Sequence, residues 1–400
     1  MREHVLRSVG AITLMSVMGL AVGCVPMPGG QAPPFPQSPQ MPQLPQPSQV
    51  PQLPQSPQLP PPPQALTQPG VVLGAGMLSK STFVQSTSLQ QVTDIVVGEL
   101  DPSPGEEIGI AGTHGVVFAD ANGQEKASLT LPVDGVHVDI VDVEGDGVCE
   151  FIDRGMWWAS ARLMDHRGRV LWSYGQGGQG VDDMGAGDVD GDGVLEFAVG
   201  FNGSGGVHLL DSQGQKLWQQ PDGNAWHVEI ADTDGDGKGE IINSNAGGRL
   251  TVRDASGRTV KQGRPPAYFS AFSLCRWPTK QDPQHAVFAE GNEVFILRFD
   301  ASVAQKFAAP NDVSHSKLVA TPVILDASGS SHLAALVRFE LWNASVLYVY
   351  DSGGSLVYHE VLADTCAALA SVSLADAATE TLLVGGTGKV WRYDAAAPAP

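Results

Sequence analysis

Cysteine is scarce in this chain, which has four cysteines among 400 residues. Cys24 lies close to the N-terminus, and the other three are Cys149, Cys275 and Cys366. Three cysteines cannot all pair within one chain, so at most one disulfide can form among them. The fold therefore does not depend on a disulfide framework, and we expect buried free thiols.

Positive charge is also scarce, with 23 Lys and Arg against 43 Asp and Glu and a formal net charge of −20. Nucleic acids are bound by basic surfaces, so the composition argues against a nucleic-acid partner. The sequence contains no Gly-x-Ser-x-Gly elbow, no His-Glu-x-x-His helix and no phosphate-binding loop. No long stretch has a helical period either, which predicts an all-β domain.

Charge is absent altogether between Arg7 and Lys80. Within that stretch, residues 26–69 hold 17 of the 29 prolines, interleaved with Gln, Ser and Leu. Proline lacks a backbone donor and such a segment cannot bury a core, so residues 24–79 are predicted to form a disordered, polyproline-like tether. A Pro-x-x-Pro ligand for a partner domain is the alternative, although no Arg flanks these motifs.

Long hydrophobic runs are missing. The longest apolar stretch, Val9–Val22, is shorter than the ~20 residues that a membrane span needs. It follows Arg2 and Arg7 and ends in Ala21-Val22-Gly23-Cys24, a pattern typical of a secretory signal. This ending resembles a bacterial lipoprotein signal. An ordinary cleaved signal or a signal anchor is the alternative.

The lipoprotein resemblance has three implications. Residues 1–23 would be removed, Cys24 would carry the lipid, and the protein would be anchored in the bacterial cell envelope. Val25 stands where inner-membrane lipoproteins of enteric bacteria tend to have Asp, which favours the outer membrane.

Three acidic, glycine-punctuated runs begin at Asp142, Asp188 and Asp232, with intervals of 46 and 44 residues. They read Asp-Val-Glu-Gly-Asp-Gly-Val-Cys-Glu, Asp-Val-Asp-Gly-Asp-Gly-Val-Leu-Glu and Asp-Thr-Asp-Gly-Asp-Gly-Lys-Gly-Glu. Glycine at positions 4 and 6 permits backbone angles that other residues resist, so each run is predicted to be a tight loop. A period of this length is typical of repeat architectures.

Carboxylates at positions 1, 3, 5 and 9 and the carbonyl of residue 7 form a hard-oxygen ligand set, which favours Ca²⁺. The predicted ligands are Asp142, Glu144, Asp146, Val148 and Glu150; Asp188, Asp190, Asp192, Val194 and Glu196; and Asp232, Asp234, Asp236, Lys238 and Glu240. An EF-hand is excluded because its Glu stands at position 12 between helices, whereas here Glu at position 9 begins a strand. The alternative is that Asp-Gly pairs merely form turns. A related run, Glu99–Glu107, has two prolines and is not predicted to bind metal.

Each acidic run is followed by period-2 apolar segments and a hairpin with Asp near its tip, which predicts strand–turn–strand units. Counting the hairpins gives seven units of ~45 residues, which predicts a β-propeller of seven four-stranded blades over residues 80–395. Residues 396–400 would be a tail, and the segment Thr82–Thr93 would add a strand that closes the ring. Six or eight blades are the alternatives.

These loops and hairpins resemble the FG-GAP/VCBS family of propeller repeats, found in integrin α-subunit heads and secreted bacterial proteins. The resemblance is good over residues 90–250 and covers 250–395 in outline, and it implies a calcium-binding propeller. The hairpins are also similar to tryptophan-docked quinoprotein blades, which implies that Trp172 and Trp218 pack between blades.

Polar residues stand five positions before each acidic run, at His137, Asp183 and His227. In a propeller they would lie on innermost strands of three adjacent blades, near one mouth of the channel, with Trp226 and the pair Trp157-Trp158 nearby. Aromatic and polar groups together suit sugar binding, and a His/Asp/His group suits metal or acid–base chemistry. The alternative is that all three are structural hydrogen-bonding residues.

The sequence therefore favours a non-catalytic binding or scaffold module for a glycan or a protein. An envelope polysaccharide-degrading enzyme is the second hypothesis, because the run after His227 looks like blades of rhamnogalacturonan-type lyases. Those enzymes are longer and carry additional modules. A quinoprotein dehydrogenase is disfavoured because the chain has no adjacent-cysteine pair.

Overall fold

The computed structural model describes residues 62, 64–98, 100, 107–131, 137–154, 159–175, 179–314, 316–374 and 378–396. The predicted signal, Cys24, most of the tether and the pair Trp157-Trp158 lie outside these residues. Among the described residues, no helix has the length and apolar character that crossing a membrane requires.

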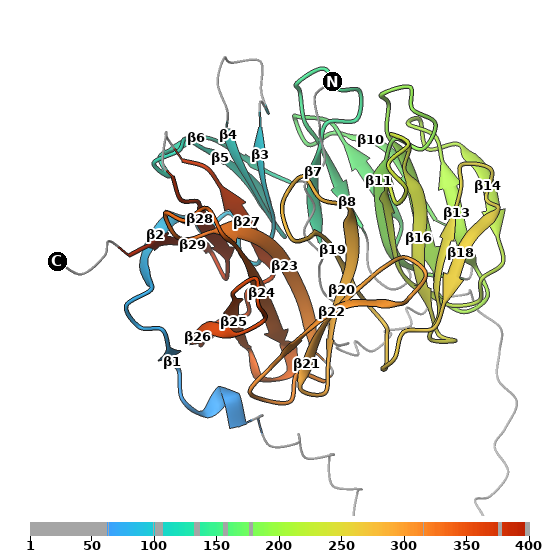
Figure 1. Ribbon diagram of the computed structural model, residues 1–400. Helices are drawn as coiled ribbons and strands as arrows, with labels where there is room; N and C mark the ends of the chain where they lie inside the picture. Colours follow the sequence, from blue (N-terminus) through green and yellow to red (C-terminus); the bar gives the residue numbers. More distant parts are fainter. Residues whose placement is uncertain are drawn as a thin grey trace, which may run out of the picture. The chain divides into compact units, whose positions relative to one another are not determined.

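The described chain forms seven antiparallel sheets, six of four strands and one of five. The sheets are arranged in a ring (Figure 1). The first three sheets comprise β3 (Val92–Gly98), β4 (Glu107–Gly112), β5 (Gly115–Ala119) and β6 (Glu125–Thr130); β7 (Val138–Val141), β8 (Glu150–Asp153), β9 (Ala161–Met164) and β10 (Val170–Tyr174); and β11 (Val181–Gly187), β12 (Glu196–Phe201), β13 (Gly206–Leu210) and β14 (Lys216–Gln220).

The next two sheets comprise β15 (Ala225–Ala231), β16 (Glu240–Asn245), β17 (Leu250–Arg253) and β18 (Thr259–Gly263); and β19 (Ser273–Arg276), β20 (Gln284–Glu290), β21 (Glu293–Leu297) and β22 (Val303–Ala308). The last two contain β23 (Lys317–Ile324), β24 (Ser331–Phe339), β25 (Ala344–Tyr350) and β26 (Leu356–Leu362); and β27 (Ala368–Val372), β28 (Thr381–Gly385) and β29 (Lys389–Ala395). We number these blades 1 to 7 in chain order.

The first strand of one blade packs against the first strand of the next, as for β11 with β15, β19 with β23 and β23 with β27. The series closes because β27 packs against β3. The fold is a seven-bladed β-propeller. The expected architecture and blade number are confirmed.

An N-terminal strand closes the ring. β2 (Leu78–Gln85) pairs antiparallel with β29 and supplies the fourth strand of blade 7. The predicted closing strand is thus present, although it begins and ends earlier than Thr82–Thr93. Closure leaves no unpaired edge on β29, which would otherwise be available for pairing with other chains.

The folded part begins before Lys80, and this corrects the expected boundary of the tether. A short 3-10 helix, Gln64–Thr67, precedes β1 (Gly70–Leu73), which pairs with β26 as a fifth strand of blade 6. Lack of charge pointed to a tether, but the run Val-Val-Leu favours a strand once an unpaired sheet edge is nearby.

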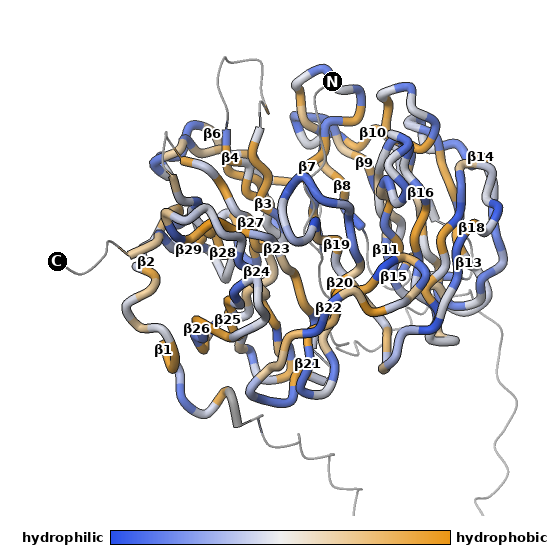
Figure 2. The backbone as a smooth tube through the Cα atoms, viewed as in Figure 1, coloured by the Kyte–Doolittle hydropathy of each residue, from blue (hydrophilic) through white to orange (hydrophobic). Residues whose placement is uncertain are grey.

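The core lies between the blades, where apolar side chains of adjacent sheets interlock. Figure 2 shows hydrophobic residues along the strands and hydrophilic residues concentrated in the turns. Trp172 of blade 2 packs edge-on against Phe197 of blade 3 and donates from Nε1 to the Ser212 carbonyl at 3.0 Å. Trp218 of blade 3 donates in the same way to Ala255 of blade 4 at 2.8 Å. The predicted tryptophan contacts between blades are confirmed.

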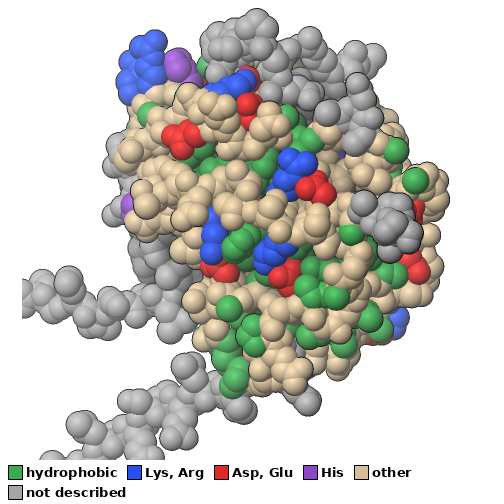
Figure 3. All heavy atoms as spheres, turned by 90° about the vertical axis from the view of Figure 1, so that its left-hand side faces the viewer, with side chains coloured by type: hydrophobic (Ala, Val, Ile, Leu, Met, Phe, Trp, Pro, Cys, Tyr) green, Lys and Arg blue, Asp and Glu red, His purple; other side chains and the backbone are tan. Residues whose placement is uncertain are grey.

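The three described cysteines, Cys149, Cys275 and Cys366, are buried free thiols, as expected. The outer surface over β1, β2 and β26 carries Lys and Arg beside Asp and Glu, with no large patch of one sign (Figure 3). One such pair joins Lys80 of β2 to Glu360 of β26 at 2.7 Å.

Candidate metal loops and ligand-binding site

The three acidic loops occupy equivalent places, between the first and second strands of blades 2, 3 and 4. Their glycines at positions 4 and 6 all have positive φ, for example +84° at Gly191 and +91° at Gly193. The Glu at position 9 is in each case the first residue of the second strand. The predicted loop conformation is therefore confirmed in all three copies.

The Asp at position 1 organises each loop by accepting backbone hydrogen bonds from the glycine-rich turn. Asp188 accepts from Gly191 N at 2.6 Å and from Gly193 N at 2.9 Å. Asp232 makes the equivalent bonds to Gly235 and Gly237. These bonds fix the backbone of the turn.

The carboxylates converge in two of the three loops. In the second loop, oxygens of Asp188, Asp190 and Asp192 lie within 4.8 Å of one another. In the third loop the corresponding group is Asp232, Asp234 and Glu240, and it does not include Asp236. Among the described residues the first loop forms no such group. Position 3 there is Glu144, whose longer side chain differs from the Asp of the other two loops.

The Glu at position 9 is buried in the second and third loops and half-buried in the first. Glu196 Oε2 accepts from Val189 N at 2.9 Å, and Glu240 Oε2 accepts from Thr233 N at 2.8 Å. Burial raises the pKa of Glu150 and of Glu196 to about 7, and the neighbouring aspartates act in the same direction. Clustered carboxylates repel one another, and a bound cation would remove that repulsion. The donor set, all oxygen, fits Ca²⁺.

Backbone hydrogen bonds join one acidic loop to the next. Leu195 N of the second loop donates to Val143 O of the first at 2.9 Å. Gly239 N of the third loop donates to Asp188 O of the second at 2.6 Å. These two bonds connect blades 2, 3 and 4 to one another at the acidic loops.

Asp183 and His227 lie on β11 and β15, the first strands of their blades, whereas His137 directly precedes β7. Of the three, only Asp183 and His227 meet. Asp183 and His227 are in direct contact through Oδ2 and Nδ1. His137 instead contacts Asp139 at 2.9 Å. All three side chains are buried.

Arg154, which no sequence pattern marked, connects the two halves of this network. It binds Asp139 at 2.6 Å and Asp183 at 2.7 Å, and it lies 3.8 Å from Glu229. Although burial alone would raise the pKa of Asp183, the charge of Arg154 holds it well below its ordinary value. The central charges are thus paired between blades 2, 3 and 4.

Trp226 belongs to a second polar group. With its amide nitrogen facing Asp182, Asn224 donates to Asp182 Oδ2 at 2.9 Å and accepts from Trp226 Nε1 at 3.1 Å. The rings of Trp226 and Tyr268 lie 6.3 Å apart, centroid to centroid. Burial raises the pKa of Asp182 to about 7, and the charge of Asp183 adds to this effect.

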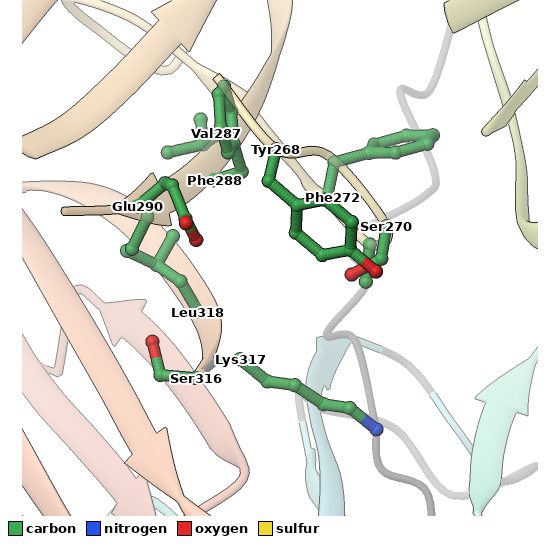
Figure 4. A pocket seen from close by; sticks show the side chains of 11 residues that line it. Tyr268, Ser270, Phe272, Val287, Phe288, Glu290, Ser316, Lys317 and Leu318 are labelled. Carbon is green, nitrogen blue, oxygen red and sulfur yellow. The ribbon is translucent and has the colours of Figure 1, made fainter. Parts of the chain in front are cut away.

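Tyr268 also lines a small cavity. It has a volume of about 30 Å³ and is lined by residues that include Ser270, Glu290, Ser316 and Lys317. Figure 4 shows the Tyr268 ring extending toward Ser270, with Glu290 on the opposite side of the cavity, while the Lys317 side chain extends away from Glu290. Glu290 also lines an open groove of about 710 Å³ beside blade 5.

No protein-family model matches the chain, and no curated protein matches it. Among solved structures, BBS1N in complex with ARL6DN is 12% identical, with a TM-score of 0.54 over 78% of this chain and 95% of that one. BamB from Moraxella catarrhalis is 13% identical, with a TM-score of 0.45 over 83% and 92%. The Pan2 WD40 domain of Neurospora crassa is 10% identical, with a TM-score of 0.48 over 80% and 96%. At these identities the similarity shows the fold alone.

Proposed function

We propose that this protein is a calcium-stabilised, FG-GAP-like β-propeller, tethered to the cell envelope by a lipid, that binds a glycan or a protein without catalysis. The main support is the pair of converging carboxylate groups in loops whose backbones are hydrogen-bonded across blades.

The calcium proposal rests on charge and position. Each loop carries four carboxylates within nine residues, and in two of the loops three of them have oxygens within 4.8 Å of one another. A divalent cation held there would replace repulsion by attraction and fix the first two strands of its blade. Because neighbouring loops share backbone hydrogen bonds, the cations would strengthen the ring across blades 2, 3 and 4.

Chelation is therefore expected to lower the melting temperature by several degrees or more. The measurement is a thermal melt of the purified protein with Ca²⁺ and with excess EGTA, accompanied by elemental analysis. The variant Asp188→Asn should lose part of the calcium response. An unchanged melt in EGTA together with no bound metal would remove the proposal.

A matched control is available in the same blade. Asp211 accepts two backbone hydrogen bonds in a hairpin, from Gln213 N at 3.0 Å and Gln215 N at 2.8 Å, as the loop aspartates do. It has no carboxylate cluster around it in the described residues. Asp211→Asn should therefore lower stability without changing the response to calcium.

A non-catalytic role is favoured by the state of the central charges. A general acid or base must reach its substrate, whereas Asp183 and His227 are buried and bind each other. The competing proposal, a polysaccharide-degrading enzyme, would require this network to open. The similar BBS1N structure is a complex with ARL6, which gives a precedent for a protein ligand on such a fold.

The anchor proposal rests on the Ala-Val-Gly-Cys sequence ending at Cys24 and on the charge-free stretch that follows. The proposed location is the outer membrane. Expression of Cys24→Ser in a lipoprotein-processing bacterium should move the protein from the membrane fraction to the soluble envelope fraction. An unchanged membrane association would contradict lipidation.

A further inference from the structure

We propose that Asp182, Asn224, Trp226 and Tyr268 bind a sugar residue of a neutral glycan, and that the groove beyond Tyr268 receives the rest of the chain. This inference rests on the proposed binding function and names its ligand class and its site. The network around Arg154 takes no part in it.

The four residues come from two neighbouring blades and the connection to a third. Asp182 and Trp226 are the second residues of β11 and β15. Asn224 precedes β15, and Tyr268 lies between β18 and β19. In antiparallel blades the first strands all begin at the same face of the ring. This face is opposite the acidic loops, which follow the ends of the first strands.

A β-bulge in β11 and another in β15 direct Asp182 and Trp226 away from the central network around Arg154. The pairing of β11 with β12 shifts register between Val181 and Asp183, and that of β15 with β16 shifts between Ala225 and His227. Asp182 and Trp226 are the bulged residues at these two shifts. Bulges re-aim side chains, and here Asp183 and His227 join the buried network while Asp182 and Trp226 meet at Asn224.

The polar part of the site has acceptors without donors. Asp182 Oδ2 accepts from Asn224, and the Asn202 side chain also interacts with this carboxyl, but the buried Oδ1 makes no hydrogen bond of good geometry. Nearby along the chain, Gln179 donates to Ser204, and its Oε1 is likewise buried and unpartnered. A buried acceptor without a donor costs free energy, and a sugar hydroxyl is a donor of the right kind.

The aromatic part of the site supplies apolar surface. Tyr268 is 55% exposed, although it is among the largest hydrophobic side chains of the domain. Its ring and that of Trp226 are inclined at 53°, so together they form an angled surface rather than a flat one. Aromatic rings with polar neighbours combine apolar contact with orientation, which a pyranose ring with its hydroxyls requires.

The site continues beyond Tyr268. The cavity of about 30 Å³ on that side has room for about one water molecule or hydroxyl group. Glu290 connects it to the open groove of about 710 Å³, which is lined by Pro266, Phe295 and Val303 among others. That volume is in the range of ligand sites, so several sugar units can be accommodated along one path.

Charge selects a neutral glycan over an acidic one. Asp182 and Glu290 lie along the path, and Glu293 in the groove is paired with Lys306 at 2.6 Å. A uronic acid or sulfated sugar would meet these carboxyl groups and be repelled. Neutral hexoses carry no charge that these groups would repel, and their hydroxyls can donate to a carboxylate.

The test uses the calcium-loaded full-length protein and a panel of neutral hexasaccharides of glucose, mannose, galactose and N-acetylglucosamine, with hexagalacturonate as the acidic comparison. Titration calorimetry should detect at least one neutral hexasaccharide and show weaker binding of hexagalacturonate. Tyr268→Ala and Asp182→Asn should each weaken binding about tenfold or more. Leu217→Ala, which removes another exposed side chain, should leave it unchanged.

The outcomes separate this inference from the proposed function. Tight binding that survives both Tyr268→Ala and Asp182→Asn would overturn the site but leave a glycan-binding module. Binding of none of these sugars would overturn the glycan inference, and a protein ligand would remain open to the proposed function. Release of unsaturated sugar ends, which only hexagalacturonate in this panel can form, would overturn both the neutral-glycan inference and the non-catalytic role. Thermal melts of each variant exclude loss of folding as the cause.

Discussion

His208 illustrates how burial of a single residue sets its charge. It lies on β13 with 1% of its surface exposed, and its Nδ1 is 2.8 Å from the Tyr174 hydroxyl. Burial lowers the pKa of His208 to about 4, so the folded protein holds this side chain neutral near pH 7.

The pH dependence of stability should reflect this residue. Between pH 6.5 and 4 the unfolded chain binds one proton at His208 that the folded protein does not, so stability falls as the pH falls. His208→Gln should reduce this loss by roughly 1–3 kcal/mol. The free energy of unfolding by urea at pH 7 and at pH 4.5 measures the effect. An identical loss in wild type and variant would contradict it.

At the same scale, the acidic-loop residues could be predicted from sequence. Glycines at positions 4 and 6 and carboxylates at 1, 3, 5 and 9 act within nine consecutive residues, so their spacing alone indicates the turn. Convergence of the carboxylates is less regular: Glu196 is absent from the second group, Asp236 is absent from the third, and the first loop forms no such group among the described residues.

At the scale of strands and blades, Arg154 links the first strands of blades 2 and 3. It follows β8 and binds carboxylates of β7 and β11, and it is 4% exposed. A second kind of link uses carboxylates and backbone. Asp183 accepts from Val228 N of the next blade at 3.1 Å, and Asp94 accepts from Ile140 N at the same distance.

Removing the guanidinium should destabilise the ring strongly. Arg154→Met leaves Asp139 and Asp183 in the interior without their counter-charge, which we expect to cost about 3–5 kcal/mol. Urea unfolding of the purified variant measures it. Arg249→Met changes an exposed arginine and should stay within about 0.5 kcal/mol of wild type. Similar values for the two variants would show that the network is not a structural link.

At the scale of the whole molecule, the two N-terminal strands contribute differently to closure of the ring. β2 completes blade 7 and closes the ring, whereas β1 only adds a fifth strand to blade 6. The two pairings are made by adjacent segments of the chain, so they can be removed one at a time.

Truncation should distinguish them. Removing residues 1–76 deletes β1 and should leave a monomer with a slightly lower melting temperature. Removing residues 1–86 also deletes β2 and exposes the edge of β29, which should cause aggregation or loss of a cooperative transition. Size-exclusion chromatography and thermal melts measure both. A monomeric longer truncation with an unchanged melt would refute the role assigned to β2.

The amino-acid sequence by itself determined the features that repeat locally: all-β blades, their number, the glycine conformations and the tryptophan contacts. These depend on spacings of a few residues, or on a pattern copied from blade to blade. Only the tertiary structure decided the partners of the central charges, the Asp182–Asn224–Trp226 group and the pairing of β1. Those contacts join segments tens to hundreds of residues apart. The strand with which β1 pairs cannot be predicted from a local side-chain pattern, because the pairing is made by the backbone. The partner of a buried charge is likewise known only once the fold has brought the two residues together.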